Sequence, residues 1–261
     1  MLQKRIIPCL LLRNGLLVKT IQFDNPRHIG EPIYAIKIFN DYEVDELAIM
    51  DIMASRPESI RPSPPRSIPF ELISKISDES CMPVSYGGRV RSIPDIQQLF
   101  KAGVEKVCIN TAAVENPRFI KDAAREFGSQ SIVVSIDVKQ YNNGNYQVFI
   151  NGGTRLTSLD PAHHAIQMQQ VGAGEILLNS IDRDGMMGGY DIPLIKSVTS
   201  AVSIPVIALG GAGKTSDFTR ALSEGGASAA AAGSMFVYFG RKKGILINYP
   251  SREEIDKILM I

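Results

Sequence analysis

The chain has 261 residues, a formal net charge of +1, 44% hydrophobic residues, 21% charged residues and three cysteines. This length suits a single (β/α)8 barrel of roughly 250 residues, and a charge near zero excludes a strongly basic nucleic-acid or membrane-surface binder. No secretory segment opens the chain and no apolar run reaches membrane-spanning length, so we expect a cytoplasmic protein without membrane insertion or a nucleic-acid partner. The cysteines lack metal-ligand spacing, and we expect no metal and no cofactor.

Apolar strand-like runs alternate with amphipathic helical stretches, which predicts a parallel sheet with helices outside. Eight strands are expected, over Arg5–Leu12, Glu46–Ile52, Pro83–Tyr86, Lys106–Ile109, Ile132–Val138, Glu175–Ser180, Pro205–Leu209 and Ser228–Ala232. Helices are expected near Pro32–Phe39, Pro69–Ile76, Ser92–Ala102, Pro117–Phe127, Pro161–Val171, Ile192–Val198, Thr215–Leu222 and Ser251–Met260. The sequence therefore predicts an α/β fold, one TIM-barrel domain over residues 1–261, with functional residues where the strands end.

Three connections are expected on that face. Asn14–Gly30 follows the first strand as a long loop and carries Lys19. Arg56–Pro69 follows the second strand, is rich in proline and arginine, and is either a solvated loop or a basic lid. The fifth strand continues into a hairpin over Asp137–Asn151 that turns at residues 142–144.

Two glycine turns in the last quarter of the chain indicate a phosphate site. Pro205–Phe236 reads as strand, glycine turn, helix, strand and second turn, and its turn residues are Gly210, Gly211, Gly233 and Ser234. Backbone N–H groups at such turns bind anions, and (β/α)8 barrels commonly hold phosphate after their last two strands. The same glycines would also permit tight turns without any ligand.

A similar pattern about half a chain earlier indicates an internal repeat. Its turn residues are Gly87, Gly88, Asn110 and Thr111. In this alignment Gly87 is the partner of Gly210, and Leu11 is the partner of Asp137. A barrel made of two similar halves predicts two facing anion sites, and hence a phosphorylated or nucleotide-linked ligand with an anionic group at each end.

Several long segments carry a resemblance to a known family. They include MLQKRIIPCL at the start, INTAAVENP over Ile109–Pro117, SIDRDG over Ser180–Gly185 and GGAG over Gly210–Gly213. With these segments, the chain resembles the cyclase subunit of imidazole glycerol phosphate synthase, HisF. The resemblance implies a barrel that receives ammonia from a triad-type, HisH-like glutaminase on its N-terminal face, with Glu105 at the docking edge. It also implies a ligand with two phosphate ends, over which Lys19 closes.

The acid–base pair that the resemblance implies is incomplete. The family has aspartates at the ends of strands one and five, and this chain has Leu11 and Asp137 there. Leucine cannot transfer a proton, and general acid–base catalysis contributes about 10²–10⁴-fold, so Asp137 is the one catalytic candidate. Asp182 and Asp184 either hold the turn at Gly185 or contact the ligand, and Asp182 and Gly185 are counted as ligand-binding candidates. Further departures from the family are Arg89 in the first glycine turn, Leu209, Met53 and the pair Met186-Met187.

Four charged residues open otherwise apolar strands, at Arg5, Glu46, Lys106 and Glu175. Two cations and two anions at equivalent positions predict a ring of ion pairs across the barrel floor, because buried charges are tolerated when they pair. Such a ring either closes the core as a salt-bridge layer or, as the resemblance implies, is the ammonia gate, which we favour.

Three functions fit these observations. The tail Leu246–Ile255 resembles a family branch linked to surface polysaccharides, which favours a subunit that passes ammonia to a third, ATP-dependent sugar amidotransferase. The alternative is a cyclase–lyase of histidine biosynthesis, against which Leu11 argues. A non-catalytic scaffold is the third, and the intact ring argues against it.

Overall fold

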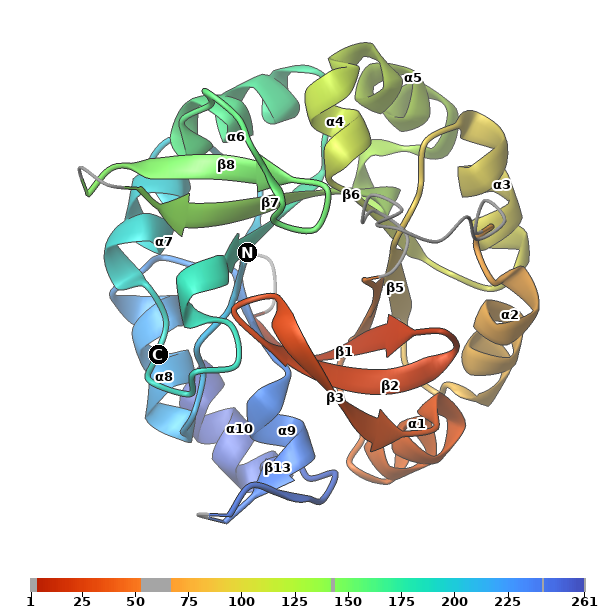
Figure 1. Cartoon of the computed structure of the whole chain (residues 1–261), viewed down its shortest axis with the longest axis vertical. Helices are drawn as coiled ribbons and strands as arrows, with labels where there is room; N and C mark the ends of the chain where they lie inside the picture. Colours follow the sequence, from red (N-terminus) through yellow and green to blue (C-terminus); the bar gives the residue numbers. More distant parts are fainter. Residues whose placement is uncertain (1–3, 53–66, 142–143, 241, 261) are drawn as a thin grey trace.

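The computed structural model describes residues 4–52, 67–141, 144–240 and 242–260. Eight parallel strands form a closed ring at the centre, with the helices outside (Figure 1). The ring pairs β10 through β11, β12, β1, β4, β5 and β6 to β7, and the pairing of β7 with β10 closes it. Their bounds are β1 Arg5–Arg13, β4 Leu47–Asp51, β5 Val84–Gly87, β6 Lys106–Ile109, β7 Ile132–Gln140, β10 Glu175–Ser180, β11 Val206–Leu209 and β12 Ala229–Ala232. The predicted (β/α)8 barrel is confirmed.

The helices that cover the barrel lie within a few residues of the predicted ranges. They are α1 Pro32–Asp41, α2 Phe70–Glu79, α3 Ile93–Lys101, α5 Pro117–Phe127, α6 Pro161–Gln170, α7 Ile192–Thr199, α8 Thr215–Ser223 and α10 Arg252–Leu259. Local chemistry explains where several begin: Pro32, Pro117 and Pro161 occupy the first turn, where a missing N–H costs nothing. Ser92 and Ser251 each form a capping box.

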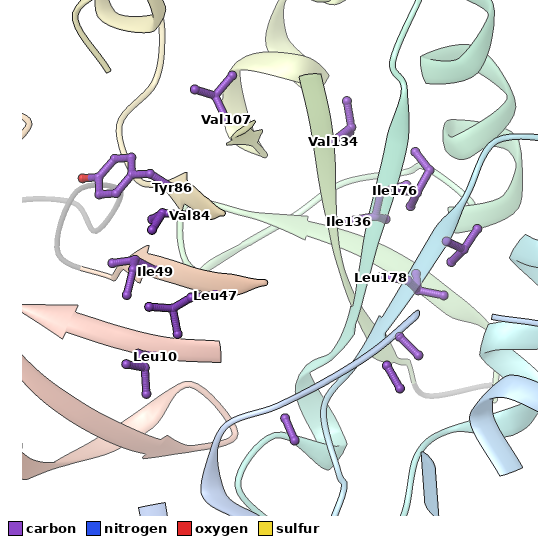
Figure 2. Close-up of a cluster of buried hydrophobic side chains, with 14 of the residues drawn as sticks. Leu10, Leu47, Ile49, Val84, Tyr86, Val107, Val134, Ile136, Ile176 and Leu178 are labelled. Atoms are coloured by element: carbon purple, nitrogen blue, oxygen red, sulfur yellow. The ribbon is translucent and has the colours of Figure 1, made fainter. Parts of the chain in front are cut away.

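Two packing zones follow from the alternation of side chains along each strand. Residues on the outer side of the strands, such as Leu10, Ile49, Val134 and Ile176, belong to the core between sheet and helices (Figure 2). Residues on the inner side form a separate cluster along the barrel axis, consisting of Ile7, Cys9, Ala48, Cys108, Val133, Leu177, Ile207, Ala229 and Ala231. The inner positions therefore determine what lies on the axis, from floor to mouth.

The connection after β1 differs from the prediction, because it is a hairpin and not a loop. Its strands are β2 Leu16–Ile21 and β3 Asp24–Gly30, and β2 pairs antiparallel with the end of β1. β3 has the sequence DNPRHIG, which is polar and contains a proline, so it lacks the apolar alternation that marks a strand. The hairpin after β7 is confirmed, with β8 Tyr146–Ile150 and a short β9 Arg155–Leu156. The turn residues 142 and 143 and most of the loop expected at 56–69 lie outside the described residues.

Strand register confirms the two-fold repeat and corrects its alignment by one residue. Leu11 pairs with Met50 of β4 and Val18 of β2, whereas Asp137 pairs in the same way with Asn179 of β10 and Phe149 of β8. Leu11 and Asp137 are therefore equivalent, as predicted.

The same comparison changes the partner of the first glycine turn. Met50 pairs with Gly87, and Asn179, the equivalent of Met50, pairs with Leu209. Gly87 thus corresponds to Leu209 rather than to Gly210, and Gly88 corresponds to Gly210. The next residue of each turn is Arg89 in one half and Gly211 in the other.

Short elements that were not predicted complete the fold. α4 Thr111–Glu115 and α9 Ser234–Val237 follow β6 and β12, the 3-10 turns are η1 Ser129–Ser131 and η2 Ile181–Arg183, and β13 Tyr238–Phe239 pairs with β14 Gly244–Ile245. Downstream, the hydroxyl of Tyr249 donates to the carbonyl of Ile6 in β1 at 2.8 Å. None of the helices in the described ranges combines the length and apolar composition needed to cross a bilayer.

A substitution at Gly174 tests how closely the chain before β10 packs against the chain before β7. A Cβ there would overlap the backbone carbonyl of Ser129, which cannot yield as a flexible side chain would. We expect Gly174→Ala to lower the free energy of unfolding by about 2–3 kcal/mol, the upper part of the range for overpacking. Urea unfolding measures the change. Gly188→Ala is the matched control, because a Cβ there meets nothing within 4 Å, and an equal loss in both variants would contradict the prediction.

Candidate functional site

A cavity of about 130 Å³ opens where the barrel strands end. Five of the predicted site residues line it, namely Lys19, Gly88, Asn110, Thr111 and Asp137. The other six at this end of the barrel, Asp182, Gly185, Gly210, Gly211, Gly233 and Ser234, are not part of its lining. The cavity therefore reaches the glycine turn after β5 but not the one after β11, although Asp137, Asn179 and Leu209 of the second half also line it.

Asp137 is the acidic group nearest to a catalytic role. Its side chain is buried, and the Nδ2 of Asn179 lies 3.5 Å from its Oδ1. Burial raises the pKa of Asp137 to about 7; the hydrogen bond from Asn179 opposes the rise, and the charge of Asp184 adds to it. A carboxyl group with this pKa exists in both protonation states near neutral pH, which suits proton transfer. Leu11, Met50 and Leu209 also line the cavity and give it apolar walls.

The β2–β3 hairpin is held down over one side of the mouth by Asp184. Its carboxylate accepts from Lys19 at 3.1 Å and from the hydroxyl of Thr20 at 2.7 Å. The backbone carbonyl of Asp184 accepts from the N–H of Gln22 at 2.9 Å. Lys19, Thr20 and Asp184 are all buried, so these hydrogen bonds hold the hairpin in place from inside the protein.

The glycine turns of the second half are buried, Gly210 and Gly211 against the chain that follows β10 and Gly233 against Lys19 of the hairpin. Gly210, Gly211, Gly233 and Ser234 are all buried, and a Cβ on Gly233 would lie 3.0 Å from Lys19 Nζ. The hydroxyl of Ser234 has no hydrogen-bond partner among the described residues. Lys19 and Ser234 are thus close to the same turn, and of these residues only Lys19 lines the cavity.

The turn of the first half is open but has different chemistry. Gly88 and Arg89 both line the cavity and both have positive φ, 144° and 57°. The side chain of Asn110 donates to the carbonyl of Ser135 at 2.9 Å. The Thr111 hydroxyl accepts from the N–H of Asn151 at 3.0 Å and donates to Asn110 at 3.2 Å. Both predicted polar side chains are therefore occupied within the protein.

Asp182 and Gly185 both make contacts within the protein. The carboxylate of Asp182 accepts from the N–H of Gln140 at 2.7 Å, which ties the end of β7 to the turn after β10. A Cβ on Gly185 would overlap the carbonyl of Thr20, so glycine there allows the hairpin to approach. The sequence left open whether Asp182 holds the turn at Gly185 or contacts the ligand, and the geometry favours turn stabilisation. Met186 is half exposed and lies outside the cavity lining, and Met53 lies outside the described residues.

The four charges at the barrel floor form the predicted closed ring of ion pairs. Arg5 donates to Glu46 at 2.5 Å and also to Glu175. The Nζ of Lys106 lies 3.0 Å from Glu46 and 3.0 Å from Glu175. Burial lowers the pKa of Arg5, but the charges of Glu175 and Glu46 outweigh burial and raise it above its usual value. Each cation therefore touches both anions; whether the ring is a gate stays a prediction.

The axis between the ring and the cavity is apolar. Successive inner positions of β1 are Arg5, Ile7, Cys9 and Leu11, with the ring at one end and the cavity at the other. Burial raises the pKa of the Cys9 thiol to about 12, while the charge of Lys19 opposes the rise. Both thiols on the axis are neutral at physiological pH, because burial raises the pKa of Cys108 as well. The buried Ser85, whose neighbours Val84 and Tyr86 belong to the outer core, adds a neutral hydroxyl beside this apolar cluster.

An open hollow lies beside the ring on the N-terminal face. It is lined by Phe100, Val104, Glu105, Lys106 and Phe127, with Gln130 and Ser131. Glu105 was expected to be available to a partner lysine, but one of its oxygens accepts from the N–H of Val84 at 2.6 Å. That carboxylate is partly used to fix the start of β5.

Sequence reasoning missed Asn179 and Thr20, and it gave Asp184 no role in holding the hairpin. Asn179 has a detectable signal, because it precedes SIDRDG at the end of a predicted strand. The contact between Thr20 and Asp184 depends on the hairpin that the sequence did not reveal. Within the described residues, no group of three or more His, Cys, Asp or Glu side chains is placed to hold a metal ion.

Comparison with known proteins gives consistent matches over this whole fold. The family described as histidine biosynthesis protein matches residues 5–243. A Leptospira interrogans protein provisionally named imidazole glycerol phosphate synthase subunit HisF is 45% identical, with 99% of each chain covered. A Pseudomonas aeruginosa protein provisionally named subunit hisF2 is 44% identical, over 98% of this chain and 99% of its own. The imidazole glycerol phosphate synthase subunit HisF of Alkaliphilus metalliredigens is 44% identical, over 91% and 92%.

The raised pKa of Asp137 predicts a pH-dependent stability. A folded-state pKa of about 7, above the usual pKa of 3.8, stabilises the protein below pH 4, and this contribution is lost as the pH rises through 7. Asp137→Asn has no such loss, so its free energy of unfolding should exceed that of the wild type above pH 7, by at most about 4 kcal/mol. The difference should shrink toward pH 4. Urea unfolding from pH 4 to 8 measures it, and a difference that does not vary with pH would contradict the raised pKa.

Proposed function

Because this chain belongs to the histidine biosynthesis protein family and matches its HisF members along nearly its whole length, we propose that it is the ammonia-using barrel subunit of a glutamine amidotransferase. A triad-type, HisH-like glutaminase on the N-terminal face supplies the ammonia. The barrel delivers it at the mouth for amidation of a sugar in surface-polysaccharide biosynthesis. A third, ATP-dependent amidotransferase activates that sugar.

The observation that carries this proposal is the order of side chains along the axis. A ring of ion pairs at the floor, an uncharged apolar middle and an acid at the mouth lie in sequence. Neutral ammonia can cross an apolar passage, whereas an ammonium ion would lose its hydration there at a high cost in free energy. The ring can admit ammonia when one ion pair opens, since each charge keeps a second partner. The hollow beside Lys106 gives a glutaminase a place to dock next to the ring.

The chemistry of the mouth favours sugar amidation over ring closure. Asp137 lies at the end of β7, and Leu11 occupies the equivalent position of the other half. Together with Met50 and Leu209, Leu11 makes the walls apolar and removes a proton donor and acceptor. Asp137, with a pKa of about 7, can hold or release one proton for arriving ammonia.

The second candidate is a cyclase subunit in histidine biosynthesis. It is favoured by the buried acid at the end of β7 and by the printed name of the Alkaliphilus metalliredigens relative. In this reading Asp137 would serve as both acid and base. A reaction that needs two proton-transfer groups would then proceed with one, which is why we rank it second.

The partner can be tested by co-purification. We expect the chain to form a complex at micromolar concentration with its own triad-type glutaminase. The floor hollow should be buried in that complex. Gln130→Arg places a charge at the exposed edge of the hollow and should weaken binding by at least about 10-fold, whereas Arg118→Ala on the outer helix α5 should leave it unchanged. Size-exclusion chromatography and calorimetry measure the complex, and failure of the wild type to bind would refute the proposal.

The missing acid predicts slow ring closure. Supplied with ammonia and the ribulosyl substrate of histidine biosynthesis, this protein should turn over at least about 10²-fold more slowly than a relative with two aspartates. Loss of that substrate, followed with and without the glutaminase, gives the rate. Turnover close to that of the two-aspartate enzymes would make histidine biosynthesis the leading function.

A further inference from the structure

We infer that one side of the barrel mouth is a docking surface for a second protein, which presents an apolar face with an acidic edge and covers the mouth to receive ammonia. The surface consists of the connections that follow β1, β7, β10 and β12, and we call it the mouth surface. Identifying the second protein as the third, ATP-dependent sugar amidotransferase rests on the proposed function, whereas the place and the chemistry of the surface come from the structure.

Exposed apolar side chains gather on this side of the molecule. Among the described residues, eleven large apolar side chains are exposed, and eight of them belong to these four connections. The most exposed of the eight are Phe239 at 66%, Leu246 at 53% and Met186 at 51%. Large apolar patches on the surface of a globular protein commonly mark an interaction site.

The four connections form one surface, because the strands before them are neighbours and the connections are joined to each other. In the ring, β7, β10, β11, β12 and β1 follow in this order (Figure 1). The N–H of Gln22 in the β2–β3 hairpin donates to the carbonyl of Asp184 after β10 at 2.9 Å, and the carboxylate of Asp182 accepts from the end of β7. From β3, Arg27 donates to the carbonyl of Lys243, between β13 and β14, at 3.1 Å. The β2–β3 hairpin therefore connects the apolar residues after β10 with those of the β13–β14 hairpin.

Basic residues accompany the apolar residues of the mouth surface. Among the described residues of these connections and of the strand ends beside them, the exposed cations are Arg27, Lys139, Arg155, Arg183 and Lys242, and the exposed acids are Asp24 and the helix caps Glu31 and Asp160. The segment from Tyr238 to Asn248, which contains the β13–β14 hairpin, has three basic residues and no acidic one. A partner with acidic residues around its apolar face is therefore complementary in charge, which speeds the encounter and fixes the orientation of the two proteins.

The same features argue against two other occupants. A second copy of this chain would bring two predominantly basic surfaces together, because like patches face each other around a two-fold axis. Lipid recognition uses adjacent groups of about 4–8 basic residues, whereas these cations are spread over four connections and alternate with Tyr141, Leu156 and Met186. Aromatic residues, methionine and arginine are enriched in the interfaces between proteins, so a protein is the occupant that fits best.

Covering the mouth also meets a need of ammonia transfer. The cavity that Asp137 lines opens beside this surface, since Lys19, Thr20 and Phe23 of the β2–β3 hairpin line it too. Ammonia that leaves an uncovered mouth would mix with bulk water, whereas a docked acceptor enzyme excludes that water and keeps the reacting groups together. The two partners then bind opposite faces of the barrel, the glutaminase at the floor and the sugar amidotransferase at the mouth.

Calorimetry of the full chain with its own sugar amidotransferase, in the presence and in the absence of the glutaminase, tests the docking surface. Phe239→Glu replaces an exposed apolar side chain by an acid and should weaken binding at least about 10-fold. Arg183→Glu reverses one complementary charge, so it should also weaken binding and make it less sensitive to salt. Tyr34→Glu is the matched control, because Tyr34 is equally exposed, at 68%, but lies on the outer helix α1; it should change the Kd by less than about 2-fold. All three variants should bind the glutaminase as the wild type does, which shows that they are folded.

Several outcomes would overturn the inference. Equal weakening by Tyr34→Glu, or unchanged binding by both Phe239→Glu and Arg183→Glu, would place the amidotransferase elsewhere. Binding of the wild type to vesicles of phosphatidylglycerol and phosphatidylcholine in place of the amidotransferase, lost in Phe239→Glu, would make the occupant a lipid surface. Self-association that is lost in Phe239→Glu would make it a second copy, and a wild type that binds none of these would leave the surface without an occupant. Formation of the glutaminase complex is measured separately on the same protein, so docking at the mouth and the proposed function can fail independently.

Discussion

Closure of eight parallel strands into a ring is the constraint on which the rest of the structure depends. Once the ring is closed, every second side chain of each strand faces one common axis. The inner positions of β1 place Arg5 at the floor, Ile7 and Cys9 in the middle and Leu11 at the mouth. A shift of one residue in β1 would move the apolar outer residues to the axis and break the floor ring. The order of charge, apolar surface and acid along the barrel axis therefore depends on the register of the strands.

Departures from two-fold symmetry determine which chemical groups each half of the barrel contributes to the mouth. Register equates Leu11 with Asp137 and Arg89 with Gly211, so each half lacks one group that the other has. In the half that has the acid, the residues of the glycine turns are buried. In the half that has Leu11 instead, the turn after β5 lines the cavity and includes Arg89. The acid and the guanidinium therefore come from opposite halves of the barrel.

The sequence predicted what depends on local periodicity. All eight barrel strands and the helices around them lie within a few residues of their expected positions, because apolar runs and helix starts such as Pro117 and Ser92 are local signals. The ring was predictable because each of its charges opens an apolar strand. The β2–β3 hairpin was not, since β3 is polar and the hairpin is held through β2 and its turn by contacts with Asp184 far along the chain.

At the site, too, features that depend on contacts between distant residues could not be predicted from the sequence. The sequence identified Asp137 and Leu11 as equivalents, and register confirms this. It could not reveal which glycine turn is open, because burial of Gly233 depends on where the hairpin and Lys19 lie. The alignment of Gly87 with Gly210 was wrong by one residue, because repeated glycines match at more than one offset, whereas strand pairing fixes one.

The pairing of β1 with β12 has a consequence for how the chain folds. Residues Arg5 to Pro8 of β1 pair with β12, and Tyr249 is hydrogen-bonded to Ile6, so the first part of this edge of β1 receives its partners only from the last part of the chain. During synthesis β1 can pair with β4 on one edge and with β2 at the far end of the other, while the segment that will pair with β12 keeps unsatisfied N–H and C=O groups beside apolar neighbours. Contacts of such long sequence separation form slowly, because a large loop must close first. We therefore regard the nascent barrel before closure as the species most exposed to aggregation, and the all-alanine strand β12, with no bulky side chain to orient, as a partner suited to enter the remaining gap last.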